Sequence, residues 1–96
     1  MRMDEIREQL DYLFALFKQS AQEGNLPSHD DLENLVRLSR RMHSQADEEW
    51  LDEAEDFLHL ANQLQVAVKQ ENIQDAIPLI DSLNEAYSFC YPFISS

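Results

Sequence analysis

Residues 47–56 hold the densest group of ionisable side chains in this 96-residue sequence. The segment contains seven carboxylates and no basic residue. Carboxylates at this density either form a solvated helix surface or attract an oppositely charged partner. If they attract a partner, the candidate partner-binding residues are Asp47, Glu48, Glu49, Asp52, Glu53 and Asp56.

Two roles for this acidic segment follow from the sequence, and both stay open. In the first, the acids lie at the beginning of a helix, where the helix dipole and Arg37, Arg40 and Arg41 offset their charge. In the second, they dock a protein with a basic surface, or they mimic nucleic-acid phosphates and so inhibit a DNA-binding protein. Direct binding to nucleic acid or to a membrane is not expected, because a net charge of −12 repels phosphates. A homodimer also stays open.

The other chemically capable residues do not form an enzyme signature. Asp56 and His59 have the acid-x-x-His spacing of dinuclear-iron bundles, but neither of the other two histidines follows an acid at that spacing. Gly24 is the one glycine, so a glycine-rich phosphate loop is absent from the sequence. Cys90 lies in an apolar segment without neighbouring bases, which predicts a buried, inert thiol. We therefore expect neither an enzyme nor a metal or cofactor site.

Helices must position these residues. Apolar side chains recur at spacings of three and four over residues 4–22, 30–44, 46–70 and 72–89, which is the periodicity of amphipathic helices. Ser28 is expected to cap the second helix. The pattern predicts an all-α protein, an antiparallel up-down-up-down four-helix bundle that forms one domain over residues 1–96. The predicted core contains Leu13, Phe14, Phe17, Leu35, Phe57, Leu64, Ile80 and Leu83.

The beginning of the last helix depends on Pro78. A cap at Asn72 would place this proline in the second turn, whereas a cap at Asp75 would place it in the first turn, where its missing N–H costs nothing. The preferred prediction is a short turn over 72–75 and a helix from about Ala76 to Phe89. The apolar tail, residues 91–94, is expected to pack on the bundle. Trp50 and Met42 are likewise expected in the core.

The composition favours a globular domain, with 44% hydrophobic residues. No stretch approaches the ~20 apolar residues that cross a bilayer. The N-terminus also lacks the basic and then apolar pattern of a signal peptide. A cytoplasmic location is therefore expected.

Residues 64–93, with the sequence LQVAVKQENIQDAIPLIDSLNEAYSFCYPF, resemble the last hairpin of the small four-helix cytochromes of the c-prime and b types. They also resemble bacterial proteins whose bundle ends in a degenerate Cys-His remnant of the haem motif. Covalent haem requires Cys-x-x-Cys-His, but Tyr87 stands at the first cysteine and Tyr91 at the axial histidine. A b-type site needs a C-terminal histidine and an N-terminal methionine. Met3 could serve as the methionine, but no histidine follows His59. The resemblance therefore implies a cytochrome-like frame without haem.

Three functions follow from these features. The first is a small acidic, non-enzymatic helical bundle that acts through protein–protein contacts. The second is a carrier of a ligand or haem-type group on a cytochrome-like frame. The third is the acidic nucleic-acid mimic that inhibits a DNA-binding protein.

Overall fold

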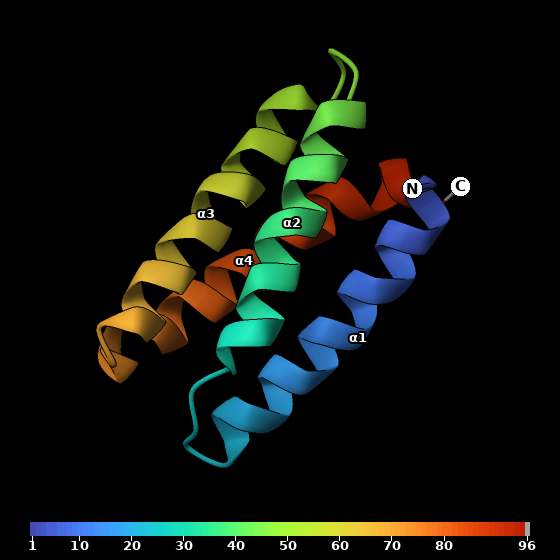
Figure 1. Ribbon diagram of the computed structural model, residues 1–96. Helices are drawn as coiled ribbons and strands as arrows, with labels where there is room; N and C mark the ends of the chain where they lie inside the picture. Colours follow the sequence, from blue (N-terminus) through green and yellow to red (C-terminus); the bar gives the residue numbers. More distant parts are fainter. Residues whose placement is uncertain (96) are drawn as a thin grey trace.

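The computed structural model describes residues 1–95, and they form four antiparallel helices in up-down-up-down order (Figure 1). The helices are α1 (Met3–Gln22), α2 (His29–Gln45), α3 (Leu51–Lys69) and α4 (Ile73–Ile94). Each helix packs against its neighbours in the sequence, and α1 also packs against α4, which closes the bundle. The predicted fold class is confirmed. None of the four helices has the length and apolarity needed to cross a membrane within residues 1–95.

The interior is apolar and is rich in aromatic rings. Seven of the eight predicted core residues are buried: Leu13, Phe17, Leu35, Phe57, Leu64, Ile80 and Leu83. Trp50, Met42 and Cys90 are buried as predicted. Phe14 is only half-buried, so its placement in the core was wrong. Its ring lies at the boundary between α1 and α4, where it stacks on Tyr87 with the ring centroids 4.9 Å apart.

The connection between α1 and α2 contains Gly24 and the predicted Ser28 cap. Gly24 has a φ of 74°, in the left-handed region that a residue without a Cβ adopts without strain. The Asn25 N–H then donates to the Ser20 carbonyl at 2.8 Å, which closes the end of α1. Ser28 caps α2 as predicted, because its Oγ accepts the Asp31 N–H at 3.1 Å.

The third helix begins at Leu51, so the predicted beginning at Ala46 was wrong. A local turn replaces the first helical residues. The Asp47 side chain accepts the Glu49 N–H at 3.0 Å, and the Asp47 carbonyl accepts the Trp50 N–H at 3.2 Å. Aspartate favours such turns because its short side chain competes for nearby backbone N–H groups.

The fourth helix begins at Ile73, so the prediction of a turn over 72–75 was also wrong. Asn72 is the cap: its Oδ1 accepts the Asp75 N–H at 3.2 Å, and its Nδ2 donates to the Asp75 carboxylate at 2.7 Å. Pro78 therefore lies inside the helix. Its ring is exposed, so the lost backbone hydrogen bond falls on the solvent side of α4, where water can replace the missing donor.

The end of α4 continues beyond the predicted Phe89 and through Pro92 to Ile94. The predicted packing of the apolar tail is confirmed, because Ile94 is buried and Phe93 stacks on Trp50 at a centroid distance of 5.4 Å. This stack joins the last turn of α4 to the beginning of α3. The extra helical turn is therefore stabilised by tertiary contacts rather than by its own sequence.

Candidate functional site

The six candidate partner-binding acids lie together at one end of the bundle, in two structural settings. Asp47, Glu48 and Glu49 belong to the α2–α3 connection, whereas Asp52, Glu53 and Asp56 lie in the first two turns of α3. Five of the six are exposed, and Glu53 is half-buried. We call these six residues the acidic cluster.

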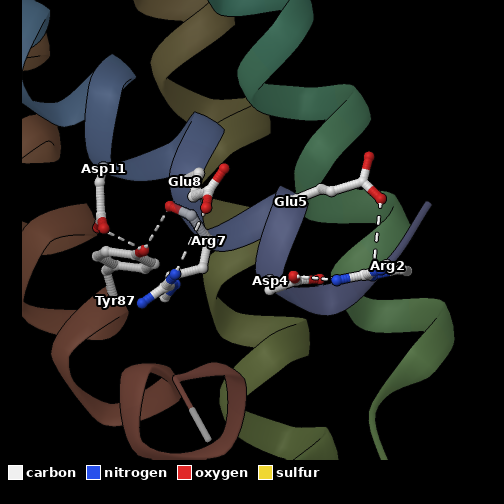
Figure 2. Close-up of polar contacts among 7 residues, drawn as sticks. All are labelled: Arg2, Asp4, Glu5, Arg7, Glu8, Asp11 and Tyr87. Atoms are coloured by element: carbon white, nitrogen blue, oxygen red, sulfur yellow. Dashed lines mark hydrogen bonds and ion pairs between the residues drawn. The ribbon is translucent and has the colours of Figure 1, made fainter.

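The acidic cluster has no direct ion-pair partner within residues 1–95. The ion pairs in that part of the chain join Arg2 to Asp4 and Glu5, and Arg7 to Glu8, all in α1 or just before it (Figure 2). The three arginines of α2 were expected to offset the acids, but none of them comes within 4.0 Å of a carboxylate oxygen among these residues. The dipole of α3 remains as a favourable local interaction for the acids of its first turn.

Cys90 lies close enough to the cluster to be affected by it. Its side chain is fully buried, and burial raises the pKa of the Cys90 thiol to about 11, with smaller contributions from the negative charges of Glu53 and Asp56. The thiol is therefore protonated at neutral pH and is a poor nucleophile. The burial of Cys90 is as predicted, and the inert role of its thiol stays a prediction.

Two open hollows extend along the outer boundary between α3 and α4. One has a volume of about 590 Å³ and lies between His59 and the α3–α4 turn, where Gln70 and Asp75 line it. The other, of about 320 Å³, is lined by Asp56 and Phe89 at its far end. His59 lines both hollows, so they are neighbours along the α3–α4 boundary, and we treat them together as one groove. We call it the α3–α4 groove; it extends from Asp56 and Phe89 to Gln70 and Asp75.

The α3–α4 groove combines exposed apolar side chains with acids. Val66 is 53% exposed and Phe89 is 61% exposed, both high values for apolar residues. Asp56, Asp75 and Glu85 supply negative charge, and neither lysine nor arginine is among the residues that line its two hollows.

Sequence reasoning did not identify this groove. The sequence feature that could have revealed the groove is a second row of side chains along α3, at residues 56, 59, 63, 66 and 70. This row lies beside the row that packs into the core.

A second polar feature joins α1 to α4, as Figure 2 shows. The Tyr87 hydroxyl donates to an Asp11 carboxylate oxygen at 2.8 Å and lies 3.3 Å from the Arg7 carbonyl oxygen. Burial raises the pKa of Tyr87, and the hydrogen bond to Asp11 acts in the same direction. The sequence did not reveal this pair, since Asp11 resembles the many exposed acids and Tyr87 belongs to an apolar stripe.

The side chains at the end of α4 do not fit covalently attached haem. The resemblance would align Tyr87 with the first cysteine of the motif, and the Tyr87 hydroxyl donates a hydrogen bond to Asp11. The resemblance would align Tyr91 with the axial histidine, and its ring packs edge-on against the Tyr87 ring. Cys90 is the one cysteine of the sequence, whereas covalent attachment through Cys-x-x-Cys-His needs two.

A metal site built from protein side chains has no support from the geometry of residues 1–95. No three His, Cys, Asp or Glu side chains in that range are grouped so that they could hold an ion. Comparison of the chain with protein-family models, with curated proteins and with solved structures finds no match.

Proposed function

We propose that this protein is a non-enzymatic interaction module, and that its acidic cluster binds a basic surface on another protein. The observation that supports this proposal is the combination of exposure and missing ion pairs: five of the six carboxylates are exposed, and none is paired within residues 1–95. The cytoplasm is the proposed location.

Exposed and unpaired carboxylates lower the stability of the bundle, but they favour association with a basic partner. Like charges at one end of a small bundle repel one another and oppose folding. The same charges attract a basic partner over about one Debye length, ~8–10 Å at physiological ionic strength, and so accelerate association. A basic partner surface would supply the cations that the chain itself does not place beside the cluster.

The test compares two triple variants with the same change in charge. One changes Asp52→Asn, Glu53→Gln and Asp56→Asn in the cluster. The control changes three exposed glutamates elsewhere: Glu23, Glu33 and Glu71 to Gln. The partner is recovered by affinity capture with mass spectrometry, and association rates are then measured against salt concentration.

We expect the cluster variant to associate about tenfold more slowly at low salt and to show a weaker salt dependence, while the control variant behaves like the wild type. Equal rates for wild type and cluster variant at every salt concentration would contradict the proposal. If duplex DNA releases the captured partner, the interaction is the nucleic-acid mimicry considered above. Circular dichroism of both variants checks that the helices persist.

A further inference from the structure

We infer that the α3–α4 groove binds an amphipathic, basic α-helix of the partner protein. This inference rests on the proposed function, since Asp56 belongs both to the acidic cluster and to the groove. The groove would add a second contact surface beside the acidic cluster.

The length and the walls of the groove suit a helix. Its walls extend over residues 56–70 of α3 and 75–89 of the antiparallel α4, or about 21 Å at a rise of ~1.5 Å per residue. A helix of about 14 residues matches that length. Two helices packed side by side form a groove that accepts the side-chain ridge of a third. An extended segment would have no strand edge to pair with, because residues 1–95 contain helices and connections only.

Apolar anchors lie in both halves of the groove. Val66 lines the larger hollow and Phe89 lines the smaller one, and each leaves more than half of its side chain in water. Between them the walls contain the half-buried Leu60, Leu79 and Ala86. Apolar residues spaced by three and four along a bound helix would cover this row and remove its surface from water.

The charges of the groove select a basic helix over other occupants. Asp56 and Glu85 line the smaller hollow, Asp75 lines the larger one, and no lysine or arginine lines either. A second copy of this chain would bring the same acids together, and a net charge of −12 opposes that contact. Nucleic acids and anionic lipids are repelled for the same reason. Lysine or arginine residues flanking the apolar row of a partner helix would instead be attracted.

The experiment uses a defined probe, a fluorescently labelled synthetic helix of about 14 residues. Leucines at positions i, i+4, i+7 and i+11 form its apolar row, and lysines flank that row. A control peptide has the same composition in shuffled order. A second control has glutamate in place of lysine. Affinity for the intact protein is measured by fluorescence anisotropy at several salt concentrations.

Two double variants locate the binding site. Val66→Ser with Phe89→Ser removes exposed apolar anchors from the groove. Tyr12→Ser with Ile77→Ser is the matched control, because Tyr12 and Ile77 are 66% and 40% exposed and line neither hollow of the groove. All four positions are exposed, so both variants are expected to fold.

We expect the groove variant to weaken binding of the lysine–leucine helix by about tenfold or more, and the control variant to leave it unchanged. The shuffled and glutamate peptides should bind more weakly than the lysine–leucine helix. Equal affinity for the shuffled peptide would show that charge alone acts and would overturn the inference. A dimer in solution that the groove variant dissociates would also overturn it, because a second copy would then be the occupant.

The two proposals can fail separately. If the groove variant binds the helix as the wild type does, while the cluster variant still slows association with the captured partner, the groove inference is wrong and the proposed function stands. If the groove variant loses the helix, while the cluster variant associates as fast as the wild type, the groove binds a helix and the proposed function of the cluster fails.

Discussion

Tyr87 is the residue at which the aromatic interior meets the polar surface of the bundle. Its ring stacks on Phe14 and contacts Phe57 and Tyr91, while its hydroxyl hydrogen-bonds to Asp11 on α1. Aromatic pairs in such arrangements add to the stability gained from burial, and the phenol must find a hydrogen-bond partner when buried. One side chain of α4 therefore holds α1 through both apolar and polar contacts.

Cys90 gives a pH-dependence that can be measured. Burial raises the pKa of its thiol to about 11 in the folded protein, above the ordinary value of 9.0 that applies to the unfolded chain. The unfolded thiol therefore loses its proton at a lower pH than the folded one. Its contribution to the free energy of unfolding is complete below about pH 9 and is lost as the pH rises toward about 11.

The Cys90→Ala variant isolates this contribution. We expect wild-type stability to fall more steeply than that of the variant between pH 9 and pH 11. Urea unfolding at a series of pH values measures the free energy of unfolding of each protein. The slope of this free energy against pH is then compared between the wild type and the variant. Parallel slopes would show that the buried thiol does not hold its proton more tightly in the folded state.

At the scale of single elements, α4 begins with a side-chain cap ahead of an unfavourable residue, Pro78. The reciprocal hydrogen bonds between Asn72 and Asp75 begin the helix one turn earlier than Pro78 would favour. An N-cap contributes about 0.5–2 kcal/mol, and the proline is on the exposed side, where water can compensate for its missing donor. The early start places Ala76 on the buried face of α4 within a regular helix.

We expect Asn72→Ala to lower the free energy of unfolding by about 1 kcal/mol, because it removes the acceptor for the Asp75 N–H. Denaturant unfolding measures the change. The control is Asn84→Ala, at an exposed position inside the same helix, for which a change within about 0.5 kcal/mol is expected. Equal small effects at both positions would contradict the assignment of Asn72 as the cap.

At the scale of the whole molecule, the residues that the cytochrome resemblance would align with a haem motif have other neighbours. Tyr87 and Cys90 are buried, and the exposed Tyr91 packs edge-on against the Tyr87 ring. The charge is also unfavourable, since haem propionates would meet a chain of net charge −12.

We therefore expect titration with haemin to give no saturable Soret shift beyond that of an unrelated acidic bundle. Absorbance spectroscopy of the purified protein is the measurement, and Cys90→Ala is the control variant. A sharp, saturable shift that this variant abolishes would show that Cys90 binds haem iron and that the carrier function is correct.

The sequence by itself determined the helix count, the order of the helices and most of the core. Residues such as Leu13, Phe17 and Leu64 repeat with the period of a helix, and that period is a local property that needs no knowledge of neighbours. The Ser28 cap is local in the same way, because its hydrogen bond spans three residues. The positions of the six acids near the beginning of α3 also followed, to within a few residues.

Only the tertiary structure decided where α4 ends, which side chains far apart in the chain contact each other and where the groove lies. Phe93 extends α4 because Trp50, distant in sequence, stacks on it. Phe14 stays half-buried because it meets Tyr87 at the edge of the interior rather than inside it. The groove needs α3 and α4 side by side, since His59 and Phe89 line one hollow only when the two helices pack. Contacts between residues far apart in the chain leave no periodic signal in either segment, which is why they could not be predicted from the sequence.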